Sequence, residues 1–447
     1  MQKNEEYIIE ITGYSSEGSG IGRVNSVVVF VPSAAAGDVV RVKILKVKKN
    51  CAFGKITEII TPSPSRIKND CASFNQCGGC VYRHIRYEDE CNIKSLKVYD
   101  AVKRIGGINM PPAELIPSEK QNHYRNKAQY PVSPDGFAGF YAFRSHRIVK
   151  CVSCPLQPEI FDKIISACSD WAVKNNISIY SEETHTGKLR HIYIRLAEKT
   201  EEIMVCLVIN GTSLPFKDEL TDILKSICKD RLKSFQININ RDKTNIILGK
   251  ECVTLFGSPY ITDILCGVKV RLSPLSFYQV NRTTAEKLYK KAAEYAEPQG
   301  KTVLDLYCGA GTIGLSMASK AKKIIGVEIV PEAVEDARFN AKLNGIENAE
   351  FICSDASEAA KLLALKEINA DVIIVDPPRK GCSAELISVI TDKFKPERVV
   401  YVSCDPATFA RDIKLFGEKG YVLREYTPVD MFPRTSHIET AAWFSLA

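Results

Sequence analysis

The chain of 447 residues contains the segment VLDLYCGAGTIG, residues 303–314. Its first residues are apolar, as in a buried strand, and its end has the spacing G-x-G-x-x-G, which is typical of a tight turn into a helix. The glycines Gly309 and Gly311 allow the backbone to approach a ligand closely at the helix N-terminus. The segment therefore predicts a strand–turn–helix unit that binds a cofactor, although the glycine spacing alone does not identify that cofactor.

The sequence on both sides of this segment alternates between apolar strands and stretches with the helical period. The predicted strands cover residues 302–306, 323–328, 349–352, 371–376 and 398–403, with two more at 421–426 and 438–444. Apolar strands that alternate with helices form parallel sheets covered on both faces. Residues 266–447 are therefore expected to form a doubly wound α/β domain with a Rossmann-like sheet.

The first 60 residues have another pattern, because short β-branched stretches are divided there by Gly, Ser and Pro. Strands predicted at 7–11, 27–31, 39–47 and 54–60 suggest a small five-stranded barrel similar to oligonucleotide-binding (OB) barrels. Residues 41–55 contain six basic residues and no acidic one: Arg41, Lys43, Lys46, Lys48, Lys49 and Lys55. They either bind RNA phosphates or keep a strand edge from pairing.

A Pro- and Ser-containing linker at 61–65 leads into residues 66–265, which are expected to form a central α+β domain. A helix is predicted over 87–105, and residues 190–197 and 203–209 resemble paired strands. The signals in this region are mixed, so no sheet order is predicted for it.

Composition limits the class of protein. The chain has 45% apolar and 25% charged residues and a formal net charge of +7, without a run of eighteen apolar residues. Its polar start, MQKNEEY, is unlike a signal peptide, so a cytoplasmic protein without a membrane partner is expected. The positive charge permits an anionic partner but does not require one.

Two carboxylates narrow the choice of cofactor. Asp305 ends the first strand of the α/β domain, where a carboxylate can face the ammonium group of a sulfonium ligand. Asp376 ends the fourth strand before two prolines that fix an extended turn. Together they favour S-adenosylmethionine over NAD, whereas Glu328 at the end of the second strand could bind a ribose hydroxyl of either. The alternative for each Asp alone is a helix N-cap.

One of the sixteen cysteines stands where chemistry is expected. Cys404 ends the fifth strand and precedes a helix N-terminus, a position that favours a reactive thiolate. A thiolate that attacks C6 of uracil makes C5 nucleophilic enough to accept a methyl group, and a general base must then remove the C5 proton. His437 and Glu439 are both candidates for that base, and their spacing does not distinguish them.

The motifs resemble those of the RNA uracil-5 methyltransferases, which depend on S-adenosylmethionine. Five segments carry the resemblance in the family's order: FYQVN at 277–281, DLYCGAG at 305–311, DPPRKG at 376–381, SCDP at 403–406 and VDMFPRTSHIE at 429–439. The resemblance implies Cys404 as nucleophile and Glu439 as base. It also implies a set of residues around the cofactor: Gln279, Tyr307, Glu328 and Asp376, beside Asp305, Gly309 and Gly311. Asp405 stands where many members have Asn.

The N-terminal barrel resembles a TRAM domain, an RNA-binding module that the transfer-RNA branch of this family usually lacks. The resemblance therefore implies a uridine of 23S ribosomal RNA as substrate, with transfer RNA as the alternative, and neither DNA nor an oligomer is expected. A catalytically inactive ribosome-assembly factor is disfavoured by the intact Cys404, Glu439 and Asp376. A radical enzyme would need C-x3-C-x2-C, which does not occur. Cytosine C5 methylation would need a Pro-Cys motif, which is missing at the sheet.

A cluster of cysteines suggests a metal site. Cys71, Cys77 and Cys80 lie close in sequence, and Cys151 and Cys154 follow later, a spacing that suits zinc or an iron–sulfur cluster. The resemblance implies a 4Fe–4S cluster whose fourth ligand precedes a Pro-Leu pair, which here selects Cys154. Arginines nearby, Arg83, Arg86 and Arg125, either bind phosphates or only solvate the surface.

Overall fold

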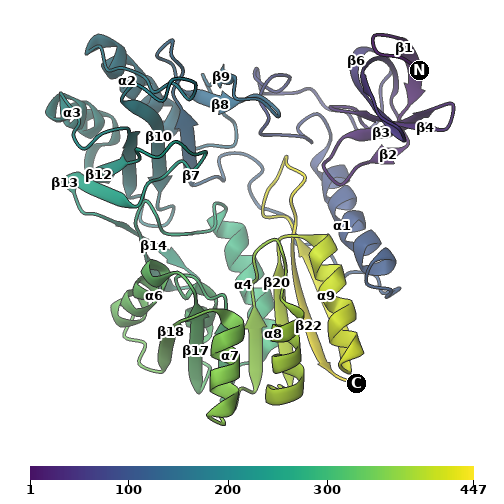
Figure 1. The fold of residues 1–447 in the computed structure, drawn as a ribbon, viewed down its shortest axis with the longest axis vertical. Helices are drawn as coiled ribbons and strands as arrows, with labels where there is room; N and C mark the ends of the chain where they lie inside the picture. The colour runs from purple at the N-terminus through teal and green to yellow at the C-terminus, as the bar shows by residue number, and fades with distance from the viewer.

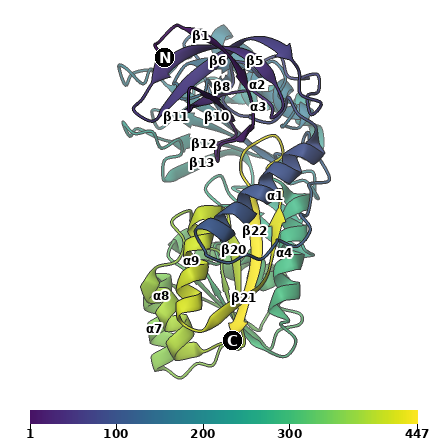
Figure 2. The same ribbon diagram turned by 90° about the vertical axis from the view of Figure 1, so that its right-hand side faces the viewer.

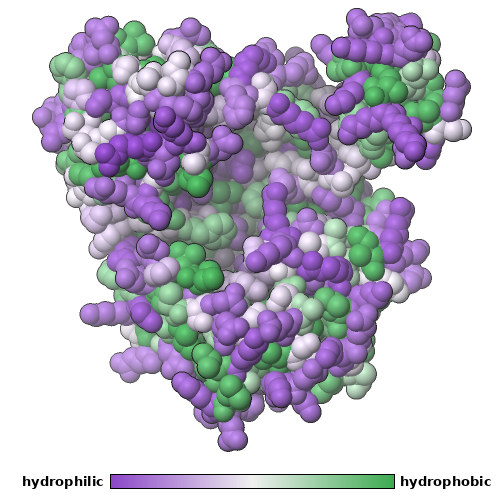
Figure 3. Space-filling view, in the orientation of Figure 1, coloured by the Kyte–Doolittle hydropathy of each residue, from purple (hydrophilic) through white to green (hydrophobic).

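The computed structural model describes all 447 residues and places them in three lobes (Figure 1). The N-terminal and central lobes lie side by side, and both lie above the C-terminal lobe in Figure 1. A view of the same face as a solid surface shows a hollow where the three lobes meet (Figure 3). None of the helices is both long enough and apolar enough to cross a membrane.

The N-terminal lobe is a curled sheet of six strands in the order β1-β5-β6-β4-β3-β2. Its strands are β1 (Glu6–Glu10), β2 (Gly13–Tyr14), β3 (Gly20–Val24), β4 (Val27–Val31), β5 (Val39–Val47) and β6 (Cys51–Thr61). The expected number of five strands is therefore wrong by one. The sequence between residues 12 and 25 is rich in Gly and Ser and lacks the β-branched run by which strands are recognised, so β2 and β3 were not predicted.

Helix α1 (Tyr87–Arg104) confirms the helix predicted over 87–105. Although it lies within the segment 66–265, it packs against α9 (Pro406–Glu418) and β21 (Tyr421–Val429) of the C-terminal lobe. Figure 2 shows it running along that lobe toward the N-terminal barrel. The predicted domain limits stay a prediction, but α1 shares its core with the C-terminal sheet.

The central lobe is built on a five-stranded sheet in the order β13-β12-β11-β10-β7. The antiparallel pairing of β10 with β11 confirms the two paired strands predicted there. The elements of this lobe are β7 (Lys127–Pro131), β8 (Gly139–Tyr141), β9 (Ile148–Lys150), α2 (Glu159–Lys174), β10 (Leu189–Leu196), β11 (Ile203–Ile209), α3 (Lys217–Cys228), η1 (Lys229–Arg231), β12 (Leu232–Ile239) and β13 (Glu251–Gly257). Strand β7 forms an edge of the sheet.

The C-terminal lobe confirms the predicted doubly wound sheet, with seven strands in the order β18-β17-β16-β19-β20-β22-β21. The strands are β16 (Thr302–Leu306), β17 (Lys323–Glu328), β18 (Ala349–Cys353), β19 (Val372–Val375), β20 (Arg398–Ser403), β21 and β22 (Glu439–Leu446). All pair in parallel except β22, which is antiparallel to both of its neighbours.

Helices cover both faces of this sheet in two separate apolar cores. Helices α4 (Arg282–Ala296), α5 (Thr312–Met317) and α6 (Pro331–Leu343) pack on one face, together with the hairpin β14 (Ile261–Leu265) and β15 (Val268–Leu272). Helices α1, α7 (Ala356–Leu365), α8 (Ala384–Val389) with η2 (Ile390–Phe394), and α9 pack on the other. The sheet is thus closed on both faces, and only its strand ends are free to form a site.

Candidate active site

The predicted site residues meet at one edge of the C-terminal sheet. The strands β16, β17, β19 and β20 run in parallel, so the residues at their carboxyl ends lie on the same edge. Because β22 runs in the opposite direction, its first residue belongs to that edge as well. The structure therefore gathers Asp305, Glu328, Asp376, Cys404 and Glu439 along a single line of strand ends.

The glycine-rich turn after β16 has the geometry of a ligand cradle. Its backbone is left-handed at Tyr307, Gly309 and Gly311, with φ of 64°, 53° and 78°. A Cβ atom on Gly311 would lie 2.9 Å from a ring carbon of Phe351, so only glycine fits there. A non-glycine residue such as Tyr307 adopts this conformation only where its surroundings enforce it, as at ligand sites.

Asp305 is fully buried and only half satisfied. One carboxylate oxygen accepts a hydrogen bond of 2.9 Å from the backbone N–H of Gly314, while the other has no partner. Burial raises the pKa of Asp305 to about 7, and burial alone does the same for Asp376. A buried, unpartnered carboxylate oxygen next to a second carboxylate is suited to a cationic ligand.

The other residues expected around the cofactor lie on neighbouring segments. One carboxylate oxygen of Glu328 accepts the backbone N–H of Gly309 at 3.1 Å, which ties the end of β17 to the glycine turn. Gln279 is buried, and both Gln279 and Asp376 influence the ionisation of Tyr289 on α4. The segment 277–281 is therefore folded back to the same edge of the sheet as Asp376.

Cys404 and Glu439 face each other across the strand ends. In the pairing of β20 with β22, Ser403 stands opposite Thr440, so the next residue of β20 and the preceding residue of β22 are neighbours. Burial and then the charges of Glu439 and Asp376 raise the pKa of Cys404 to about 11. Burial and Asp376 likewise raise the pKa of Glu439 well above its usual range. The two groups thus disfavour each other's negative charge.

The departure at Asp405 has a structural explanation. Its side chain caps α9, accepting hydrogen bonds of 2.9 Å from the N–H of Ala407 and 3.0 Å from that of Thr408. Asn caps helices equally well, so either residue starts the helix directly after the nucleophile.

The structure separates the two candidates for the base by their exposure. Glu439 is 5% exposed, whereas His437 lies at the surface. Partial loss of hydration and the cations Arg379 and Lys97 lower the pKa of His437 to about 4, so its ring is neutral near pH 7. Arg379 also influences Cys404 and Glu439. The sequence indicated no role for it, although it lies within the DPPRKG segment.

A buried ion network holds the loop that leads to Glu439. The ammonium group of Lys94 on α1 donates to Glu90 and Asp430, each at 2.7 Å, and both carboxylates and the lysine are fully buried. Arg434 donates its backbone N–H to Glu90 at 2.6 Å and accepts hydrogen bonds from the N–H groups of Val81 and Tyr82. This loop is thereby fixed to α1 and to the segment directly after Cys80.

The four cysteines implied as cluster ligands line one cavity of about 520 Å³, and Cys151 is not part of its lining. No three His, Cys, Asp or Glu side chains in the structure are close enough together to bind a single metal ion. The cavity also contains Gly78 and Gly79, and a Cβ atom on Gly79 would lie 3.5 Å from the sulfur of Cys77. Cys71, Cys77, Cys80 and Cys154 are therefore brought together around a space larger than one ion.

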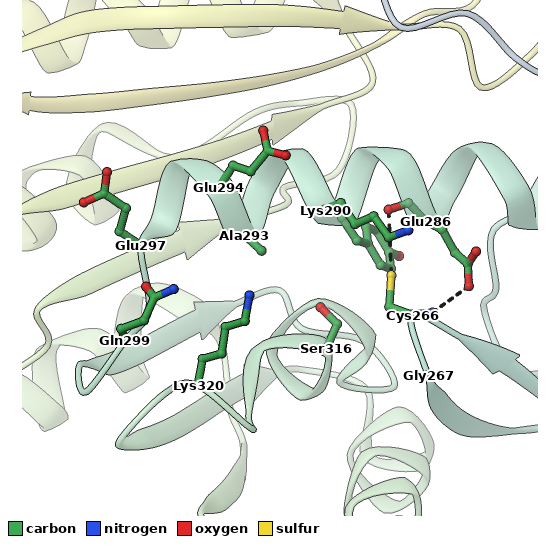
Figure 4. A pocket seen from close by; sticks show the side chains of 11 residues that line it. Cys266, Gly267, Glu286, Lys290, Ala293, Glu294, Glu297, Gln299, Ser316 and Lys320 are labelled. Carbon is green, nitrogen blue, oxygen red and sulfur yellow. Dashed lines mark hydrogen bonds between the residues drawn. The ribbon is translucent and has the colours of Figure 1, made fainter.

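A second cavity of about 510 Å³ lies along α4 (Figure 4). Its wall carries both signs of charge, including Glu286 and Lys290 on the helix and Lys320 across from it. Glu286 accepts the backbone N–H of Cys266 at 2.9 Å. None of the predicted site residues lines this cavity, so it is separate from the strand-end site.

Fold and site together define an S-adenosylmethionine-dependent methyltransferase. The family model for tRNA (uracil-5-)-methyltransferases matches residues 89–446, and that for the TRAM domain matches residues 2–57. The chain belongs to the RNA uracil-5 methyltransferase family and carries an N-terminal TRAM domain.

Individual relatives agree with this assignment over the whole chain. An uncharacterized RNA methyltransferase of Clostridium tetani is 45% identical over 444 residues, covering 98% of this chain and 96% of its own. One of Halalkalibacterium halodurans is 42% identical, covering 100% and 98%. The crystal structure of the Pyrococcus abyssi tRNA (uracil-54, C5)-methyltransferase with S-adenosyl-L-homocysteine has a TM-score of 0.81 at 29% identity, covering 98% and 99%.

Proposed function

We propose that this enzyme methylates C5 of a uridine in RNA through a covalent bond between Cys404 and uracil C6. The observation that carries the proposal is the placement of Cys404 and Glu439 side by side at the strand ends, on the same edge of the sheet as the glycine turn. Gln279, Tyr307, Glu328 and Asp376 would hold S-adenosylmethionine, together with Asp305, Gly309 and Gly311. The residues fit a cationic ligand because Asp305 keeps a buried oxygen without a partner.

The first step belongs to Cys404. Its partly exposed thiol releases its proton to solvent water, and the sulfur adds to C6 while the electrons of the C5–C6 double bond move to C5 and the C4 carbonyl. S-adenosylmethionine supplies the methyl group that bonds to C5. The negative charges of Glu439 and Asp376 raise the pKa of Cys404, and the positive charge of Arg379 opposes this rise and so favours the thiolate.

The last step belongs to Glu439. Its carboxylate accepts the C5 proton, the C–H electrons re-form the double bond, and the sulfur leaves as a thiolate. A buried carboxylate with a raised pKa is a stronger proton acceptor than an exposed one. Arg379, whose charge opposes this rise, stabilises the ionised form that the step requires.

RNA that contains 5-fluorouridine tests both roles, because fluorine cannot leave as a proton does. The wild type should form a stable protein–RNA adduct, and Cys404→Ala should form none. Glu439→Gln should attack and methylate ordinary RNA but then stall, so that an adduct accumulates without fluorine, with turnover reduced by about 10²–10⁴. If His437→Ala accumulates the adduct and Glu439→Gln turns over normally, the base is His437.

For the substrate we propose a uridine of 23S ribosomal RNA, on the resemblance to the family's ribosomal branch. Transfer RNA is the second candidate, since the similar Pyrococcus abyssi enzyme acts on tRNA and its chain is matched over 99% of its length. An N-terminal barrel therefore does not separate the two substrates. Mass-spectrometric mapping of 5-methyluridine in both RNA fractions of a deletion strain tests this choice. Loss from transfer RNA alone would contradict the ribosomal proposal.

We further propose that Cys71, Cys77, Cys80 and Cys154 hold a 4Fe–4S cluster. Four thiols around one cavity support it, as does the position of Cys151 outside that cavity. Protein purified without oxygen should be brown with about four iron atoms per chain. Substitution of each proposed ligand by Ser should remove the colour, and Cys151→Ser should keep it. Stoichiometric zinc in a colourless anaerobic preparation would overturn the cluster.

A further inference from the structure

Two cations stand directly opposite each other on the central sheet. In the antiparallel pairing of β7 with β10, Lys127 is the register partner of Arg195. Like charges in this position repel and destabilise a sheet unless something neutralises them. Neither side chain forms an ion pair with a carboxylate of the protein, and the charges that act on Lys127 are those of the cations Arg195 and Arg125.

Both cations lie on the face of the sheet that is turned toward the C-terminal lobe. The neighbouring residues Ala128 and Ile194 point to the other face, into the core of the central lobe. Tyr193, which shares the face of Arg195, packs into the core formed with the C-terminal lobe. Since β7 is the edge strand, Lys127 stands at the edge of this face, where it is half-buried.

The site is built rather than accidental. Arg195 is 1% exposed and donates to the carbonyl oxygens of Ser273 at 2.9 Å and Ser276 at 2.7 Å, directly before the segment 277–281. Its Nε atom is buried without a partner. Asn126, directly before Lys127, donates to the carbonyl oxygen of Gln279 at 2.9 Å. The cations are thus fixed to the segment that supplies Gln279.

A third cation extends this group toward the active site. Arg125 lies two residues before Lys127 and lines the cavity of the four cysteines, and its Nε atom is also buried without a partner. Its positive charge contributes to lowering the pKa of Lys127 and that of His437. Burial and then the charges of Arg195 and Arg125 lower the pKa of Lys127 to about 8. The three side chains therefore form a row from the central sheet to the catalytic loop.

We propose that Arg125 and Lys127, which are both partly exposed, bind the phosphates of the RNA strand that carries the target uridine, while the buried Arg195 adds its positive charge behind Lys127. This inference rests on the proposed function, because it presumes that RNA enters the strand-end site. A bound phosphodiester would supply the negative charge that these cations lack within the protein. Figure 3 shows a hollow between the lobes that is wide enough to be seen on the surface of the molecule.

The test uses the full-length enzyme with Lys127→Met, Lys127→Arg and, as a matched control, Lys233→Met. Lys233 lies on the same sheet, is exposed, and has no ion pair. Binding of a labelled single-stranded oligouridine is measured against salt concentration. Lys127→Met should bind about three- to ten-fold more weakly at low salt, and the slope of log affinity against log salt should fall by about 0.7. Lys127→Arg should restore binding, and the control should match the wild type.

Thermal unfolding of the free protein separates this role from a structural one. Removal of an uncompensated charge should leave the melting temperature of Lys127→Met unchanged or raised. The KM for RNA should rise while the KM for S-adenosylmethionine and kcat stay unchanged. Arg125→Gln serves as a second variant with the same expected loss of affinity.

An unchanged salt slope in both Lys127→Met and Arg125→Gln would overturn the inference. So would weaker binding together with a lowered melting temperature that Lys127→Arg does not restore. Failure of the proposed function looks different. In that case the wild type forms no 5-fluorouridine adduct, although the oligouridine binding of Lys127→Met is still reduced.

Discussion

Two buried groups of charges in this protein are built in opposite ways. In the network of Glu90, Lys94, Asp430 and Arg434, two acids and two bases are hydrogen-bonded to one another. At the strand ends, Asp305 and Glu439 are buried and Asp376 is half-buried, yet all three are acids and no lysine or arginine forms an ion pair with them.

The difference shows how the protein uses buried charge. Where it neutralises charges internally, as around Lys94, they fix a loop. Where the protein leaves an excess of positive or negative charge, the neutralising charge has to come from a ligand. A cationic methyl donor suits the acids at the strand ends, and anionic RNA suits the row of Arg125, Lys127 and Arg195. The following predictions test this distinction.

The largest effect is expected for Lys94→Met. Removal of one partner from a buried ion network leaves the carboxylates of Glu90 and Asp430 uncompensated, which costs about 3–5 kcal/mol. Denaturant unfolding measures this loss, with Lys103→Met at an exposed position of the same helix as control. A loss no greater than that of the control would show that the network does not stabilise the fold.

The next effect concerns pH. Burial raises the pKa of Asp305 and Asp376 to about 7, so the folded state binds their protons more tightly than the unfolded state. Stability should therefore fall by a few kcal/mol as pH rises from about 4 to about 7. Unfolding of the ligand-free enzyme across this range measures the slope, and Asp376→Asn should reduce it. A stability that rises with pH throughout would contradict the excess of buried acid.

A smaller effect is expected on the choice of ligand. Asp376→Asn removes one negative charge, so the preference for S-adenosylmethionine over the uncharged thioether S-adenosylhomocysteine should weaken by about 1–2 kcal/mol. Calorimetric titration of both ligands gives this difference. Glu335→Gln, an exposed acid on α6, is the control and should leave the preference unchanged.

The smallest effect on stability is expected at the exposed pair of Arg41 and Glu58 in the barrel, where the two side chains are 3.0 Å apart. Such pairs contribute only about 0.2–1 kcal/mol, so Arg41→Ala should unfold almost as the wild type does. If the basic segment binds phosphates, the same variant should still reduce the salt dependence of RNA binding. Glu58→Gln controls for the loss of the pair. An unchanged salt dependence would favour the alternative of strand-edge protection.

The sequence predicted the C-terminal sheet well because its strands are buried on both faces and appear as continuous apolar runs. The bounds of β16, β17 and β20 were predicted to the residue. Strands β2 and β3 were missed because Gly and Ser give no local strand signal. The strand ends also indicated where Asp305, Asp376 and Cys404 would meet, since this follows from topology alone.

Charge pairing could not be predicted in this way. The opposition of Lys127 and Arg195 depends on a register between strands, and 336 residues separate Lys94 from Asp430. Neither leaves a pattern in the local sequence. The choice between His437 and Glu439 also depends on register, which places Glu439 beside Cys404, and the catalytic assignment itself stays a prediction.

The link between Lys94 and Asp430 has a consequence for biosynthesis. Helix α1 leaves the ribosome long before the residue that neutralises it, and its lysine and glutamate must stay hydrated until nearly the whole chain has been made. The same final segment carries Glu439. A ribosome that stalls or releases the chain before residue 430 would therefore yield a product in which α1 is not packed and Glu439 is missing. Such fragments should be readily degraded.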